Sequence, residues 1–103
     1  MRRDARKDDN QSEIVGELRV LGCSVAVTHR LGEGFPDIVV GIAGRNWMFE
    51  IKTEGGGRLT LDEAEFQDLW RGQYDVIYCT EDALEIMGRG DGGWGTGDGE
   101  EAR

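Results

Sequence analysis

The order of helix-like and strand-like segments in this chain predicts an α/β sandwich with a central mixed β-sheet. Three observations support this prediction. The length of 103 residues suits one domain and leaves little room for a second. The chain alternates helical and strand patterns in the order αβββαβα. Seven of the 17 glycines fall between residues 88 and 99, which separates a compact domain from a tail.

The first predicted helix starts at residues 10–13, where the sequence Asn-Gln-Ser-Glu has the form of a capping box. Apolar residues then recur at helical spacing until Gly22 ends the helix. Three strands are expected next, because short segments rich in valine and isoleucine are separated by turn residues. These strands are residues 23–29, 37–42 and 47–52, and a turn at residues 43–46 joins the last two.

The second half of the domain is predicted to contain a helix, a strand and a last helix. The sequence Thr-Leu-Asp-Glu at residues 60–63 is another capping box, and the helix that it opens closes at Gly72. We expect Phe66, Leu69 and Trp70 of this helix to lie in the core or in a dimer contact. The remaining elements are a strand at residues 74–79 and a short helix capped by Thr80.

The two ends of the chain are expected to be flexible. Residues 1–9 are polar with mixed charges, which predicts a frayed N-terminal arm. Residues 88–103 are too rich in glycine to bury enough apolar surface to offset the entropy of ordering them. The folded domain is therefore expected to span residues 10–87.

The net charge of the chain limits how this protein could bind a phosphate group. Twelve Lys and Arg against 21 Asp and Glu give a net charge of −9. This balance argues against binding nucleic acid or membrane by bulk charge, since such proteins carry basic surfaces. It does not exclude an enzyme that meets phosphates through bound cations, because a metal ion relieves the repulsion within a carboxylate cluster.

Targeting and cysteine patterns favour a cytoplasmic protein. The chain has no run of about 18 apolar residues that would predict a transmembrane helix. Its charged first residues are not followed by the apolar segment of a secretory signal. Cys23 and Cys79 fit neither a zinc-ligand spacing nor a disulfide scaffold, so we expect reduced cysteines.

The predicted hairpin gathers polar residues on one of its faces. If residues 44–45 form its tip, Asp37 pairs with Lys52 and Val39 pairs with Glu50. Because side chains alternate along a strand, both acids and the lysine then project from the same face. The opposite face is apolar, which supports this alternation, and consists of Ile38, Val40, Ile42, Trp47, Phe49 and Ile51.

Two carboxylates and a lysine on one face suggest a cation site. Mg²⁺ prefers oxygen ligands at about 2.1 Å, usually one or two carboxylates with waters and a substrate phosphate. Lys52 beside such an ion could orient or deprotonate a water, and Glu13 could reach the site as a third acid. The alternative is an ordinary exposed Asp–Lys pair on a solvated sheet face, which contributes only about 0–1 kcal/mol.

These residues resemble the PD-(D/E)xK nuclease signature. The sequence Gly-Phe-Pro-Asp at residues 34–37 is followed, after twelve residues, by Glu-Ile-Lys at residues 50–52. The chain is most similar to the small VRR-Nuc and Holliday-junction-resolvase-like nucleases, many of them from bacteriophages. In those proteins a capped helix with an acid, here Glu13, precedes the signature. A Leu-Thr loop, here residues 59–60, and a helix ending in WxG, here residues 70–72, follow it.

The resemblance covers residues 10–87 and implies a restriction-endonuclease-like fold. It implies that Asp37 and Glu50 bind Mg²⁺ or Mn²⁺ together with the Ile51 carbonyl. Lys52 would position the attacking water and stabilise the transition state, and Glu13 would complete the acidic set.

The resemblance also implies a DNA substrate, such as a Holliday junction, another branched duplex or a flap, in a bacterial or phage-infected cell. Relatives often carry a glutamine early in the helix after the Leu-Thr loop, where this chain offers Glu63, Ala64 or Gln67. Arg45, Arg58 and Gln67 are candidate DNA contacts. We expect a homodimer, because one domain of this size offers a small DNA footprint. The alternative is a non-catalytic module on the same fold that binds DNA structures or recruits a partner.

Overall fold

The computed structural model describes residues 2–90, with side chains for residues 10–88. Its helices and strands follow the predicted order αβββαβα, with a short 3₁₀ helix added after the first strand. The elements are α1 (Arg2–Val20), β1 (Ser24–Val27), η1 (His29–Leu31), β2 (Ile38–Ile42), β3 (Arg45–Ile51), α2 (Leu61–Leu69), β4 (Asp75–Ile77) and α3 (Thr80–Gly90).

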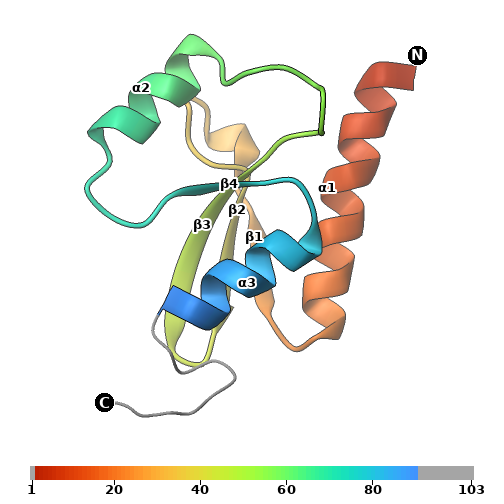
Figure 1. Cartoon of the computed structure of the whole chain (residues 1–103), viewed down its shortest axis with the longest axis vertical. Coiled ribbons are helices and arrows are strands. Elements are labelled where there is room, and N and C mark those ends of the chain that lie inside the picture. The colour runs from red at the N-terminus through yellow and green to blue at the C-terminus, as the bar shows by residue number, and fades with distance from the viewer. Residues whose placement is uncertain (1, 91–103) are drawn as a thin grey trace.

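The four strands form one mixed sheet in the order β1-β2-β3-β4. The first three strands pair antiparallel through short connections, whereas β4 pairs parallel with β3. The parallel pair needs a crossover, and α2 lies within it. Figure 1 shows α1 and α3 close together beside the sheet, with α2 set apart near the end where β3 finishes. The predicted α/β class with a mixed sheet is therefore confirmed.

The hydrophobic core lies between one face of the sheet and the two helices α1 and α3. Alternate residues of the β2–β3 hairpin point into it, and Phe49 is the largest side chain that is fully buried there. The prediction of an apolar hairpin face is confirmed, although Ile42 is only partly buried. Burial of one large apolar side chain contributes about 1.5–3 kcal/mol to folding. The core residues are Ile14, Val15, Leu18, Cys23, Ile38, Val40, Trp47, Phe49, Ile51, Ile77, Ala83 and Met87.

The β2–β3 hairpin turns one residue earlier than predicted. Ala43 and Gly44 form the turn with φ angles of 53° and 78°, and two positive φ angles are typical of a two-residue type I′ turn. Val39 consequently pairs with Met48, so its predicted pairing with Glu50 is wrong. The displacement along the partner strand is two residues, an even number, and every side chain therefore keeps its predicted face.

The first helix is longer than predicted. α1 already begins at Arg2, so the backbone of residues 2–9 is helical. This segment contains neither glycine nor proline and is rich in Arg, Lys and Ala, which favour helices. Asn10 therefore lies inside the helix and caps nothing. Its side-chain amide lies 3.4 Å from the carbonyl oxygens of Lys52 and Tyr78, to which it donates.

The last helix extends into the predicted tail. α3 runs to Gly90, so residues 88–90 are helical, and residues 91–103 lie outside the described part of the chain. None of the described helices is long and apolar enough to cross a membrane.

The predicted capping box at the start of α2 is confirmed. The Thr60 hydroxyl accepts a hydrogen bond from the Glu63 N–H at 3.1 Å, and the Glu63 carboxylate accepts one from the Thr60 N–H at 2.9 Å. No residue of α2 is buried. The expectation of a core position is therefore wrong for Phe66, which is half-buried, and for Leu69 and Trp70, which are 65% and 43% exposed. Their place in a dimer contact stays a prediction.

Candidate active site

Asp37 and Glu50 lie at the end of the sheet that is nearest to the start of α2. Asp37 directly precedes β2, and Glu50 lies near the end of β3. Continuing the hairpin register by one residue places Asp37 opposite Glu50, so its predicted pairing with Lys52 is wrong. The two acids are 6% and 0% exposed. Asp37 Oδ2 accepts a hydrogen bond from the Ile51 N–H at 2.8 Å, which fixes this carboxylate against β3.

Glu50 has a buried carboxyl group to which no N–H or hydroxyl group of the described residues donates a hydrogen bond. Its nearest cation is the Lys52 ammonium, with Nζ 3.6 Å from Oε2. Burial, then the negative charges of Asp37 and Glu63, and then a side-chain hydrogen bond with Glu63 raise the pKa of Glu50 to about 9, although Lys52 opposes the shift. The ionised form of Glu50 is therefore unfavourable unless additional positive charge comes close.

Lys52 is held by an acid from another element. Its ammonium lies 2.8 Å from Oε1 of Glu63, the same residue that closes the capping box of α2. Burial alone would lower the pKa of Lys52, but the hydrogen bond and charge of Glu63, with smaller contributions from Glu50 and Asp37, raise it. Burial alone would raise the pKa of Glu63, but its bonds to Lys52 and to the Thr60 N–H lower it. This pair is therefore ionised at neutral pH.

The loop before Asp37 sets the position of α2. Gly32, Glu33 and Gly34 all have positive φ angles, of 77°, 56° and 80°. A Cβ atom on Gly34 would lie 2.2 Å from the carbonyl oxygen of Asp62, so the loop backbone touches the first turn of α2. Only glycine fits both this φ angle and this contact. The close approach brings Glu63 within reach of Lys52.

Asp37 and Glu50 supply some, but not all, of the oxygen ligands that a divalent cation needs. Two buried oxygens on Glu50, next to the carboxylate of Asp37, provide the oxygen donors that Mg²⁺ or Mn²⁺ requires. Across the described residues, however, no group of three or more His, Cys, Asp or Glu side chains is arranged to hold a metal ion. A cation here would need further oxygen ligands, from the Ile51 carbonyl, from water or from a substrate phosphate.

The structure shows no contact between the side chains of the other predicted site residues and the group formed by Asp37, Glu50 and Lys52, with Glu63 as the exception. Glu13 is exposed on α1 and makes no hydrogen bond or ion pair with Asp37, Glu50 or Lys52. The remaining candidates are also exposed: Arg45 at the start of β3, Arg58 in the loop before α2, and Ala64 and Gln67 on α2. Of the three residues considered for the glutamine position, only Glu63 contacts the lysine.

Tyr74 is a residue of this region that the sequence analysis did not select. Its hydroxyl is buried and has no hydrogen-bond partner. A signal was present in the sequence, because Tyr74 and Val76 alternate with the core residue Ile77 and so belong to the opposite face of β4. Only the pairing of β4 with β3 shows that this is also the face of Glu50.

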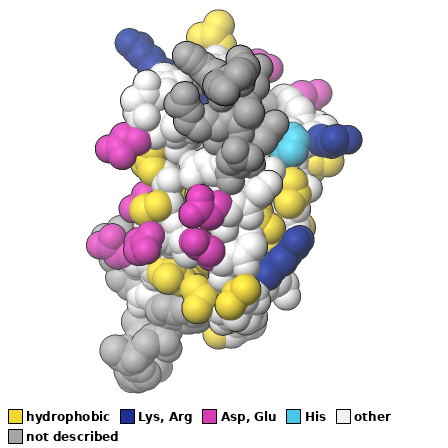
Figure 2. Space-filling model, turned by 90° about the vertical axis from the view of Figure 1, so that its right-hand side faces the viewer, with side chains coloured by type: hydrophobic (Ala, Val, Ile, Leu, Met, Phe, Trp, Pro, Cys, Tyr) yellow, Lys and Arg dark blue, Asp and Glu magenta, His cyan; other side chains and the backbone are white. Residues whose placement is uncertain are grey.

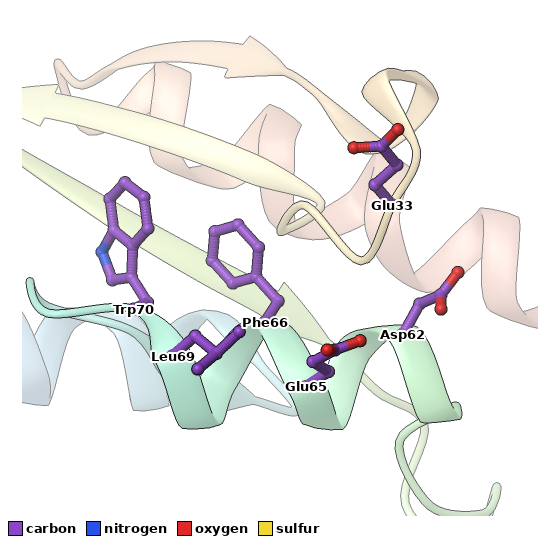
Figure 3. Close-up of a pocket in the computed structure, with 6 residues that line it drawn as sticks. All are labelled: Glu33, Asp62, Glu65, Phe66, Leu69 and Trp70. Carbon is purple, nitrogen blue, oxygen red and sulfur yellow. The ribbon is translucent and has the colours of Figure 1, made fainter.

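A pocket of about 360 Å³ lies on the same helix as Glu63. In Figure 3, Phe66 and Trp70 extend from α2 toward the strands, while Glu33 approaches from the loop before β2. The two rings stack with centroids 5.0 Å apart. The pocket is lined by Glu33, Asp62, Glu65, Phe66, Leu69 and Trp70, so carboxylates and apolar groups share it.

Among the described side chains, acidic groups are prominent on the α1 side of the molecule. Figure 2 shows acidic side chains gathered in the middle and on the left of this face, with Lys and Arg toward its edges. Glu13 and Glu17 are exposed on α1.

A scan against protein-family models found no match, and searches of curated proteins and of solved structures found none either. Function is therefore inferred from the geometry around Glu50 and from the PD-(D/E)xK resemblance of residues 34–52.

Proposed function

We propose that this protein is a metal-dependent DNA endonuclease with a restriction-endonuclease-like fold. The observation that carries the proposal is the buried carboxyl group of Glu50, which receives no hydrogen bond from an N–H or hydroxyl group and lies near a second acid and a lysine. Evolution retains such costly groups mainly at functional sites. The arrangement of Asp37, Glu50 and Lys52 at one end of a mixed sheet also agrees with the resemblance described above.

The side chains divide the work of phosphodiester hydrolysis between them. Asp37 and Glu50 would hold Mg²⁺ or Mn²⁺ with the Ile51 carbonyl, and their negative charge would offset that of the cation. The bound ion would stabilise charge on the phosphate and lower the pKa of the attacking water.

Lys52 acts as a cation in this proposal and not as a proton acceptor. Its raised pKa keeps the ammonium protonated, and Glu63 occupies one of its three N–H donors. The remaining donors can orient the attacking water and contact the phosphate, whose negative charge grows in the transition state. Glu63 restrains the lysine and thereby takes the place of the glutamine found in similar nucleases.

We further propose that the substrate is branched or flapped DNA and that the protein acts as a homodimer. A single copy of 103 residues offers a small footprint, whereas two copies would present two sites to the strands of a junction. Arg45, Arg58 and Gln67 are exposed and are the residues that we propose contact DNA. The net charge of −9 favours binding that depends on divalent cations.

The test is cleavage of labelled four-way junction, flap, duplex and single-stranded DNA in Mg²⁺, in Mn²⁺ and in EDTA. We expect cleavage that requires a metal ion and that is lost in Asp37→Asn, because this change removes one ligand charge at nearly constant shape. The preferred substrate would then define the DNA structure. Absence of cleavage of every substrate by the folded wild-type protein would contradict the proposal.

The variant Lys52→Ala tests the role of the lysine. We expect cleavage to fall by about 10²–10³-fold, the usual effect of removing a group that stabilises transition-state charge. Mn²⁺ binding should persist, because both acids remain. Arg30→Ala, which removes an exposed cation elsewhere, is the matched control. Full activity of Lys52→Ala would show that the lysine has no catalytic part.

The pocket on α2 favours a second candidate function, a module that recruits a partner. Leu69 and Trp70 are exposed there, and aromatic residues are enriched in protein-binding surfaces. Mn²⁺ binding separates the two functions, because a nuclease site must bind the ion through Asp37 and Glu50 and a recruiting module need not. A folded protein without Mn²⁺ affinity would favour the recruiting module.

A further inference from the structure

Tyr74 lies beside the proposed active site on the neighbouring strand. It directly precedes β4, which pairs parallel with β3 such that Val76 lies opposite Glu50. Side chains two residues apart on a strand share a face, so Tyr74 belongs to the face that carries Glu50. Its ring packs against Phe66, with centroids 5.8 Å apart and the ring planes tilted by 38°. The ring is therefore held by α2.

The hydroxyl of Tyr74 is a buried donor on the same face of the sheet as the buried carboxyl group of Glu50. It has no hydrogen-bond partner among the described residues, and no N–H or hydroxyl group donates to either oxygen of Glu50. Thr53 Oγ1, shortly after β3, is likewise buried and unpartnered. Buried polar groups in folded proteins nearly always have partners, and exceptions occur at sites that await a ligand or a water. These buried oxygens therefore need hydrogen-bond partners from outside the described residues, such as a water or a ligand.

The surroundings of Tyr74 keep its hydroxyl protonated, so it remains a hydrogen-bond donor. Burial, and then the charges of Glu50, Glu63 and Asp37, raise the pKa of Tyr74 well above its ordinary value. The hydroxyl therefore carries its proton at any pH at which the protein would work. It can donate to a carboxylate but cannot compete with the two acids for a cation as a phenolate.

We propose that Tyr74 is a positioning residue that donates a hydrogen bond to Glu50, directly or through one water, when Glu50 binds a divalent cation. This inference rests on the proposed nuclease function and goes beyond it, because it adds a residue outside the signature. A donor behind a metal-binding carboxylate fixes its orientation and stabilises its charge. Phe66 supports the ring from α2, so the helix that restrains Lys52 also restrains Tyr74.

The test is Tyr74→Phe, which keeps the ring and removes only the hydroxyl. Mn²⁺ binding to the whole protein, followed by electron paramagnetic resonance, should weaken by about 10–100-fold, as is typical for loss of a partner of a metal ligand. The rate of DNA cleavage at saturating Mn²⁺ should fall as well. Thermal stability in EDTA should stay equal or rise, because the variant removes a buried hydroxyl without a partner. Tyr78→Phe is the matched control, because Tyr78 is 44% exposed.

The possible outcomes separate this inference from the proposed function. Equal Mn²⁺ affinity and equal cleavage in Tyr74→Phe and the wild type would overturn the role of Tyr74 and leave the nuclease in place. A fall in Mn²⁺ affinity that is accompanied by a large loss of stability in EDTA would assign Tyr74 a structural role and would also overturn the inference. A wild-type protein that binds no Mn²⁺ would overturn both proposals.

Discussion

At the scale of single residues, the properties of the site follow from the burial of Glu50. An isolated carboxylate strongly resists transfer from water into the protein, so it either takes up a proton or acquires a cation. Glu50 has Lys52 at 3.6 Å, but that lysine is closer to Glu63. The negative charge of Asp37 adds repulsion. Glu50 is therefore a proton-binding group in the metal-free protein and a candidate ligand when a metal ion is present.

A pH dependence of stability follows from this burial. The pKa of Glu50 is about 9 in the folded protein against an ordinary 4.5, so the folded state keeps a proton that the unfolded state has already lost. The stabilisation is complete below the unfolded pKa and disappears as pH rises through the folded pKa. In EDTA, the free energy of unfolding should therefore fall between pH 5 and 9, by at most about 1.4 kcal/mol per pH unit.

Urea denaturation at several pH values measures this slope, and Glu50→Gln should flatten it because the amide does not titrate. Glu54→Gln is the control, since Glu54 is exposed in the loop after β3. A slope that persists in Glu50→Gln would show that another group causes it.

At the scale of elements, the site depends on the contact between the glycine loop and α2. The capping box positions Glu63 at the start of the helix, and Gly34 lets the loop backbone touch that first turn. Thr28 holds the other end of the loop, because its N–H donates to the Asp37 carbonyl at 2.8 Å and its hydroxyl donates to the Pro36 carbonyl at 2.8 Å. Loop and helix thus fix Asp37 and the Lys52–Glu63 pair together.

Two glycine substitutions in this loop should differ in their effects. Both Gly32 and Gly34 have positive φ angles, which cost about 1–2 kcal/mol with a Cβ atom. A Cβ at position 32 would meet nothing within 4 Å, whereas at position 34 it would collide with the Asp62 carbonyl. Gly34→Ala should therefore destabilise the protein by clearly more than Gly32→Ala and should also reduce cleavage. Urea denaturation and cleavage rates check this, and equal losses in both variants would contradict it.

At the scale of the whole molecule, one small core supports both the sheet and the site. The core packs α1 and α3 against one face of the sheet, while the acids lie on the other face under α2, which has no buried residue of its own. The site helix therefore contributes little to the core. Changes in α2 should affect function more than global stability, and changes in the core should affect both.

Phe49→Ala tests how much of the stability rests on this core. Phe49 is the largest fully buried side chain, and truncation of such a residue costs about 3–5 kcal/mol, a large part of the 5–15 kcal/mol available to a typical domain. The variant should be mostly unfolded at moderate urea concentrations. Leu31→Ala, at a position that is 65% exposed, should stay within about 0.5 kcal/mol of wild type. Similar midpoints for both variants would contradict a core centred on Phe49.

The sequence by itself determined the features that depend on local patterns. Helical and alternating spacing led to the order αβββαβα, and the Thr60–Glu63 capping box was recognised from its residues. The partition of the β2–β3 hairpin into an apolar and a polar face was also predictable. It survived an error of two residues in the register, because strand alternation has a period of two.

Only the tertiary structure decided how deeply these residues are buried and which of them meet. The early turn at Ala43–Gly44 brought Asp37 opposite Glu50 instead of Lys52. The loop at Gly34 brought Glu63 to Lys52 across eleven positions of the sequence, and the parallel β3–β4 pair brought Tyr74 to the face of Glu50. Each of these contacts joins elements that are separate in the chain. Their geometry depends on the packing of the whole domain, which local spacing does not encode.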